Sequence, residues 1–313
     1  MTHAVPPYVR TVAQLVIAGA LLALLWHAAD GPSAAQSLAA AEWPWLVCAV
    51  AFLTVQTVLS ALRWQLIARE LGISFGVPHA IREYYLAQVV NQSLPGGMVG
   101  DAARAYRERD QAGLLASGQS VVIERLVGQI AMFLTLAIAF AATLCVPGGL
   151  DWPHWLAVPV SICLLAGLSV PLILLAATRL NNPIGRGASH ILGSLRKSVF
   201  SANVLLAHIA LSVGTTFCNL AAFAACAQAV GVDLSVPAVA ALVPLILFTM
   251  LIPISVSGWG LREGAAAALL PLAGASASGG LATSVAFGLS FIVAVLPGLV
   301  FLRLKPDAER VNL

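Results

Sequence analysis

The stretch Leu94-Pro95-Gly-Gly-Met-Val-Gly100-Asp101-Ala-Ala-Arg104 has a fainter second copy, Ile252-Pro253-Ile-Ser-Val-Ser-Gly258-Trp-Gly260-Leu-Arg262-Glu263. Both copies fit the pattern Pro-x4-Gly-x3-Arg, and Pro253 of the second copy follows Pro95 of the first at an offset of 158 residues (253 − 95). Each copy interrupts an apolar stretch with helix-breaking residues and a charge. In membrane proteins, such paired interruptions indicate a transport site near the middle of the bilayer. A transport site is therefore the leading hypothesis.

The composition places the chain in a membrane. Hydrophobic residues make up 60% of it, charged residues 9%, and the mean hydropathy is +0.93, which leaves too little polar surface for a soluble domain. Runs long enough to cross roughly 30 Å of hydrocarbon as helices predict six spanning helices. They lie at about 12–29, 45–62, 126–146, 155–177, 204–230 and 281–302.

Two further apolar runs are split by the Pro/Gly motifs into short halves, 80–94 with 98–112 and 236–252 with 259–273. We interpret them as re-entrant helical hairpins. The extra spanning helix between the copies makes the two repeats run in opposite directions. We therefore predict an all-α polytopic membrane protein with an inverted repeat. Its single membrane domain (1–313) comprises a first spanning helix at 10–30, repeat A at 43–146, a linking helix and an interfacial helix at 154–200, and repeat B at 201–304.

The positive charges predict the orientation. With the N-terminus inside, all 16 Lys and Arg residues except Arg262 fall on the cytoplasmic side, as the positive-inside rule requires. The chain is thus expected to be N-in/C-in, in a bacterial cytoplasmic (inner) membrane. The net charge of +3 is explained by this orientation and by attraction to anionic lipids, so no nucleic-acid partner is expected.

The two motifs supply the candidate site. A charge near the bilayer centre costs roughly 2.5–3.5 kcal/mol on insertion scales, so Arg262 and Glu263 need partners or a wet cavity. Non-helical backbone at this depth is tolerated where it lines such a cavity, and half-helix N-termini with arginines suit a phosphate group. The predicted translocation path comprises Asn91, Pro95, Gly96, Gly97, Gly100, Asp101, Arg104, Glu124, Arg125, Pro253, Gly258, Gly260, Arg262 and Glu263.

Structural interpretations of the same residues stay open. Asp101 with Arg262, and Arg104 with Glu263, are expected as ion pairs that hold the two hairpin tips together. Glu124-Arg125 is either an interfacial ion pair or a charged wall of the cavity. Arg63-Trp64 is predicted to be a basic and aromatic anchor at the membrane interface.

Several of these motifs, in this order, resemble a known family. They are Arg63-Trp64, Tyr85, Asn91-x-x-Leu-Pro95-Gly-Gly, Gly100-Asp101-x-x-Arg104, Glu124-Arg125 and Pro253-x-Ser-x-x-Gly258-x-Gly260-x-Arg262-Glu263. Together they resemble the lysylphosphatidylglycerol synthase transmembrane-region family of flippase-like membrane proteins, over about residues 10–304. The resemblance implies translocation of an anionic or phosphate-bearing lipid between leaflets. Only residues 304–313 follow Arg303, so the synthase activity of the bifunctional members is not expected.

Three other functions remain as alternatives. An intramembrane lipid enzyme could use Asp101, Glu124 or Glu263 with Ser257, but the sequence has no G-x-S-x-G or H-E-x-x-H motif. A small-solute secondary transporter and a scaffold for a lipid-biosynthetic enzyme are the others. We predict no enzyme activity, no cofactor and no metal, and membrane lipids as the partners. A lateral opening to lipid would favour the flippase, and a closed, dry groove the scaffold.

Overall fold

The computed structural model describes residues 16, 19–20, 22–93, 98–145, 150–252 and 258–303. Every regular element in this part of the chain is a helix, which confirms the predicted all-helical class. The elements are α2 (Gly31–Ala39), α3 (Trp43–Glu70), α4 (Val77–Ser93), α5 (Val99–Arg107), α6 (Arg109–Cys145), α7 (His154–Ala177), α8 (Pro183–Ser198), α9 (Leu205–Ala229), α10 (Val236–Phe248), η1 (Thr249–Leu251), α11 (Leu261–Leu269), η2 (Leu270–Ala273), α12 (Ala277–Val295) and α13 (Pro297–Arg303).

Five of the described helices are long and apolar enough to cross a membrane. They are α3, α6, α7, α9 and the run Ala277–Phe301, which joins α12 to α13. The remaining predicted span is the first spanning helix, at 10–30. Its residues 10–15, 17–18 and 21 lie outside the described residues, whereas residues 22–28 are helical. The chain is a multi-pass membrane protein.

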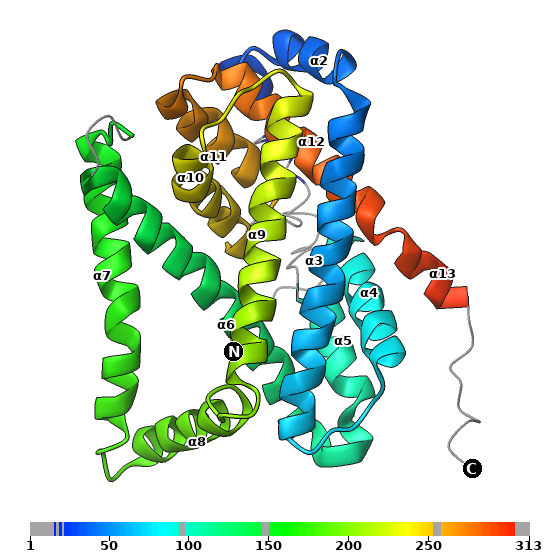
Figure 1. Ribbon diagram of the computed structural model, residues 1–313, viewed down its shortest axis with the longest axis vertical. Coiled ribbons are helices and arrows are strands. Elements are labelled where there is room, and N and C mark those ends of the chain that lie inside the picture. Colours follow the sequence, from blue (N-terminus) through cyan, green and yellow to red (C-terminus); the bar gives the residue numbers. More distant parts are fainter. Residues whose placement is uncertain are drawn as a thin grey trace, which may run out of the picture.

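Helices α3 and α9 form the central pair and cross side by side through the middle of the molecule (Figure 1). They are antiparallel, because the amide of Glu42, just before α3, donates a hydrogen bond to the carbonyl of Ala229 at the end of α9 (2.8 Å). Ala49 on α3 and Ala222 on α9 are completely buried. Such small residues let helix backbones approach closely. In a membrane the lipid is as apolar as the side chains, so helices associate through this close van der Waals packing rather than through the hydrophobic effect.

The first hairpin consists of α4 and α5. A Cβ atom at Gly100 would lie 2.1 Å from the carbonyl oxygen of Ala87, so glycine is what allows α5 to pack this closely on α4. Near the other end, Nε2 of His79 donates to Oε1 of Glu108 (2.6 Å). The start of α4 and the end of α5 therefore meet, and the chain leaves the hairpin at the end where it entered.

The second hairpin consists of α10, η1 and α11. Gly258 and Gly260 precede α11 with φ angles of 83° and 89°, a backbone conformation that favours glycine. A Cβ atom at Gly279, at the start of α12, would lie 2.9 Å from Cγ2 of Val232, just before α10, so the two ends of this hairpin also meet. Figure 1 shows the two hairpins at opposite ends of the α3/α9 pair.

The duplication extends over whole helices. Adding 158 to the bounds of α3 gives 201–228, against 205–229 for α9, and adding it to α4 gives 235–251, against 236–251 for α10 with η1. The same order of elements thus occurs twice in opposite directions. Which end faces the cytoplasm, and the limits of the repeats, stay predictions.

Helices α7 and α8 lie outside this double unit. α7 stands at the periphery, and α8 lies crosswise to it at the end of the molecule where α3 ends (Figure 1). The Asn182 side chain caps α8 by accepting a hydrogen bond from the amide of Gly185 (2.9 Å). Arg186, Arg196 and Lys197 are exposed on α8. The helix predicted for the membrane interface is therefore present, and its contact with lipid stays a prediction.

Candidate functional site

A cavity of about 400 Å³ lies between α3, α4, α6 and α9, and the second hairpin and α12 close its far side. Its lining includes four apolar residues that are strongly exposed. Met98 is 64% exposed, Leu126 44%, Leu251 55% and Ile252 43%. They come from α6 and from the break of each hairpin. Apolar side chains therefore border the mouth of the cavity and form its rim.

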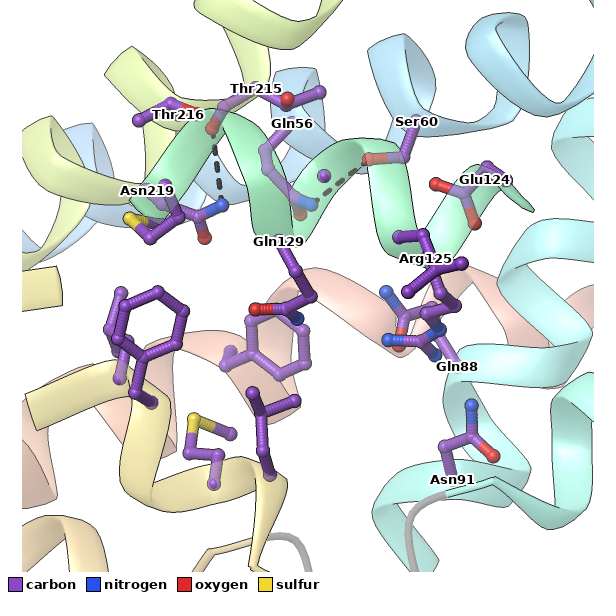
Figure 2. Close-up of a pocket in the computed structure, with 18 of the residues that line it drawn as sticks. Gln56, Ser60, Gln88, Asn91, Glu124, Arg125, Gln129, Thr215, Thr216 and Asn219 are labelled. Carbon is purple, nitrogen blue, oxygen red and sulfur yellow. Dashed lines mark hydrogen bonds between the residues drawn. The ribbon is translucent and has the colours of Figure 1, made fainter. Parts of the chain in front are cut away.

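Four helices each present polar side chains to this cavity at helical spacing. On α3 they are Gln56, Ser60 and Arg63, three positions that share one helix face. The remaining polar lining residues are Tyr84, Gln88, Asn91 and Gln92 on α4, Glu124, Arg125 and Gln129 on α6, and Thr215, Thr216 and Asn219 on α9. Figure 2 shows Gln129 near the middle of the view, below Gln56, with Asn219 on one side and Arg125 and Gln88 on the other. Polar groups inside spanning helices are costly and mark functional sites.

Glu124 is the centre of a buried charge network. Its Oε1 accepts from Nη2 of Arg63 (2.8 Å) and from the hydroxyl of Tyr84 (3.3 Å). Its Oε2 lies 3.6 Å from Nη2 of Arg104. Glu124 and Arg104 are 1% and 0% exposed, so each charge depends on its partners rather than on water.

Asp101 is the second carboxylate of this network and ties the first hairpin to α6. It accepts from Nη2 of Arg104 (3.0 Å) and from Nε of Arg125 (2.9 Å). Asn91 donates to Asp101 (3.2 Å) and accepts from the amide of Gly100 (2.8 Å). The hydrogen bonds of Asp101 and Asn91 thereby fix the start of α5 against the end of α4.

Arg104 lies behind the cavity wall. Its guanidinium is stacked between the rings of Trp64 and Tyr84, at 4.3 and 4.6 Å from the ring centroids. Cation–π contacts of this kind stabilise a desolvated cation. Arg104 is not among the lining residues, so the prediction that it contacts a ligand directly is wrong for this conformation.

The network has an excess of positive charge. Arg63, Arg104 and Arg125 contribute three positive charges, and Asp101 and Glu124 two negative ones, which leaves a net charge of +1 (3 − 2). Within the part of the chain that the structure describes, Nε of Arg63 has no hydrogen-bond partner, and neither do two nitrogens of Arg104 or Oε2 of Glu124. Arg125 is the accessible cation, with 38% of its side chain exposed. This end of the cavity suits a singly charged anion.

In the second hairpin, the charged residues Arg262 and Glu263 pair with each other. Nη2 and Nε of Arg262 donate to Oε1 of Glu263, and Nε also donates to the hydroxyl of Ser284 on α12 (3.0 Å). Oε2 of Glu263 accepts from the amide of Gly260 (2.6 Å). Both charged residues are buried and neither lines the cavity. The predicted pairs Asp101–Arg262 and Arg104–Glu263 are therefore wrong, because each residue has a partner within its own half.

Arg63 and Trp64 are also placed differently from the prediction. They are 4% and 1% exposed, and Nε1 of Trp64 donates to the hydroxyl of Ser120 (3.0 Å) while Arg63 bonds to Glu124 and Thr215. The interface anchor predicted for this dipeptide is wrong. Its two side chains point into the protein, because the charge network requires the cation of Arg63.

The structure thus divides the predicted site residues into groups. Asn91, Glu124 and Arg125 line the cavity; Gly100, Asp101 and Arg104 support it from behind; Gly258, Gly260, Arg262 and Glu263 form a separate cluster. Pro95, Gly96, Gly97 and Pro253 lie outside the described residues. The sequence prediction missed the uncharged polar lining residues Gln56, Ser60, Tyr84, Gln88, Gln129, Thr215, Thr216 and Asn219.

These features define a class: multi-pass helical membrane proteins with two opposed hairpins and a charged cavity that has an apolar rim. The family described as the lysylphosphatidylglycerol synthase TM region matches residues 11–298, so the chain belongs to that family. The membership agrees with a role connected with membrane lipids. No curated protein matches the chain.

Proposed function

We propose that this protein moves an anionic or phosphate-bearing lipid between the leaflets of a bacterial cytoplasmic membrane. The observation that carries the proposal is the buried network with a net charge of +1, which faces a cavity with an exposed apolar rim. A lipid headgroup enters the cavity while its tails stay in the surrounding hydrocarbon. The polar lining lowers the cost of carrying a charged group across the membrane.

The charge of the network supports an anionic headgroup. One phosphodiester group balances the excess charge, and Arg125 has the exposure to meet it. The guanidinium fork matches phosphate oxygens in a bidentate way, which a lysine does not do. Nη1 of Arg125 makes no hydrogen bond within the described residues, whereas Nε and Nη2 bind Asp101.

The rim supports a lipid over a small solute. Leu126, Leu251 and Ile252 border the cavity and are 44%, 55% and 43% exposed, and we propose that this apolar rim faces the hydrocarbon of the membrane. An apolar rim that faces hydrocarbon would admit a molecule that arrives within the membrane plane. This agrees with the discriminating feature expected for a flippase.

The second part of the proposal is that the protein moves its substrate without a chemical reaction. Glu124, Asp101 and Glu263 all bind arginine side chains, which is a poor environment for a general base. We propose that the chain is not an enzyme and that a lipid-biosynthetic enzyme of the same membrane supplies its substrate.

A vesicle assay tests the proposal. Purified protein is reconstituted, and the transfer of fluorescent phosphatidylglycerol between leaflets is followed by quenching of the outer leaflet. The wild type should exceed protein-free vesicles, and Arg125→Ala should lower the rate at least about tenfold, as expected for loss of a charge-assisted hydrogen bond. Arg186→Ala, an exposed arginine on α8, is the matched control and should retain the rate. Absence of transfer by intact wild-type protein would instead support the scaffold or the solute carrier.

A further inference from the structure

The charged network occupies only one end of the cavity. The rest of its polar lining is uncharged and consists mainly of side-chain amides, those of Gln56, Gln88, Gln129 and Asn219, with the hydroxyl of Thr216. An amide both donates and accepts hydrogen bonds. This lining is therefore suited to a group that does the same, which a hydroxyl does and an acyl chain does not.

Several of these polar groups have no hydrogen-bond partner among the described residues. Gln88 is 8% exposed and its side chain makes no hydrogen bond within the described residues, although it faces the cavity. The Gln129 side chain, near the middle of the cavity in Figure 2, makes none with those residues either. Asn219 uses Nδ2 to donate to the carbonyl of Thr215 (3.1 Å), which leaves its Oδ1 available. A buried amide without a partner is unfavourable, so a ligand or water completes these bonds.

The same lining has no place for a positive group. Glu124 is the only acid among the described lining residues, and its oxygens face Arg63 and Arg104. An ammonium group in the cavity would meet the cations of Arg63 and Arg125 without an unpaired carboxylate to balance it. A cationic lysyl headgroup, as in the lipid for which the family is named, does not match this arrangement.

We infer that the substrate is a lipid with one phosphodiester group and an uncharged, hydroxyl-bearing headgroup, such as glycerol or a cyclic polyol. The phosphate faces Arg125, and the hydroxyls bind Gln88, Gln129 and Asn219. The cavity volume of about 400 Å³ lies at the small end of ligand pockets, which range over roughly 300–1,000 Å³. It accommodates a headgroup and excludes the tails. This inference rests on the proposed lipid translocation.

Headgroup competition in the vesicle assay tests the inference. Initial transfer rates are measured for fluorescent phosphatidylglycerol, phosphatidylinositol, phosphatidylethanolamine and lysylphosphatidylglycerol, which share the diacylglycerol and phosphodiester. The wild type should transfer the first two at least about fivefold faster than the two lipids with ammonium groups. Gln129→Leu should lower the rates for the hydroxyl-bearing lipids by roughly five- to tenfold, as expected for loss of one or two hydrogen bonds. The control Gln36→Leu replaces an exposed glutamine on α2 and should preserve the selectivity.

A third variant tests the charge argument by adding a negative charge to the cavity. Gln129→Glu has the size of the wild-type side chain and adds the missing carboxylate, so phosphatidylethanolamine and lysylphosphatidylglycerol should become relatively better substrates. Equal transfer of all four lipids by the wild type would overturn the headgroup inference and leave the translocation intact. Unchanged selectivity in both Gln129 variants would also overturn it. Absence of all transfer would overturn the translocation and the inference together.

Discussion

Oε1 of Glu124 on α6 lies 2.8 Å from Nη2 of Arg63 on α3, and both side chains are at least 95% buried. This ion pair joins the first and last helices of one repeat and holds one wall of the cavity in place. Breaking a buried pair by removing one partner leaves an uncompensated charge and costs about 3–5 kcal/mol. The pair is therefore a sensitive point for the stability of the whole fold.

Glu124→Ala should destabilise the protein strongly, because it leaves Arg63 and Arg104 without their shared carboxylate. We expect a loss of about 3–5 kcal/mol in the free energy of unfolding, measured by thermal unfolding in detergent. Asp110→Ala removes an acid whose side chain is 80% exposed and should change the stability by less than about 0.5 kcal/mol. Equal effects of the two substitutions would contradict the network.

Gly100→Ala should disrupt the first hairpin. The added methyl group would lie 2.1 Å from the carbonyl oxygen of Ala87, so α5 has to move away from α4. Overpacking of this kind costs about 1–3 kcal/mol. Gly118→Ala on α6, where a Cβ atom meets no atom within 4 Å, should be neutral or stabilising. Unfolding midpoints of the two variants against wild type make the comparison, and a neutral Gly100→Ala would contradict the close packing.

Coupling energies should distinguish pairing within a half from pairing between halves. In double-mutant cycles with alanine, Arg262 and Glu263 should show an interaction energy above about 1 kcal/mol, since they are hydrogen-bonded. Arg104 and Glu263 should be additive within about 0.5 kcal/mol, because they share no partner. A large coupling between Arg104 and Glu263 would restore the pairing between hairpins that the sequence suggested.

The contact between His79 and Glu108 should make stability depend on pH. The hydrogen bond to Glu108 is the largest contribution that raises the pKa of His79 above its ordinary value of 6.5. A raised pKa in the folded state means that the stabilisation is complete below pH 6.5 and is lost as the pH rises through the higher folded value. The unfolding midpoint of the wild type should fall between pH 6 and 9 more than that of His79→Gln. Parallel pH profiles would contradict this.

The sequence predicted the all-helical class and the apolar spans well, because apolar length is a local signal. The membrane topology of the two hairpins stays a prediction. It also identified Asn91, Glu124 and Arg125 as residues of the cavity. The pairing of charges could not be predicted in this way. Asp101 and Arg104 are one helical turn apart, and Arg262 and Glu263 are neighbours, so each half supplies partners for its own charges.

The uncharged lining was missed for a different reason. Gln56, Gln129 and Thr216 lie on three helices that are far apart in the sequence, and they face one cavity only through the packing of α3, α6 and α9. A usable signal was nevertheless present. A polar residue every fourth position within an apolar run, such as Gln56 with Ser60, or Arg125 with Gln129, marks a helix face turned away from lipid.

The closed charge cluster of Arg262 and Glu263 has a consequence for how the two halves work together. All five charges of the Glu124 network belong to residues 63–125, within the first half. The two halves are alike in shape but unlike in chemistry. If they exchange shapes during a transport cycle, the charge does not pass from one to the other. The inward-open and outward-open forms are then electrostatically unequal, and a headgroup travels with the first half in both.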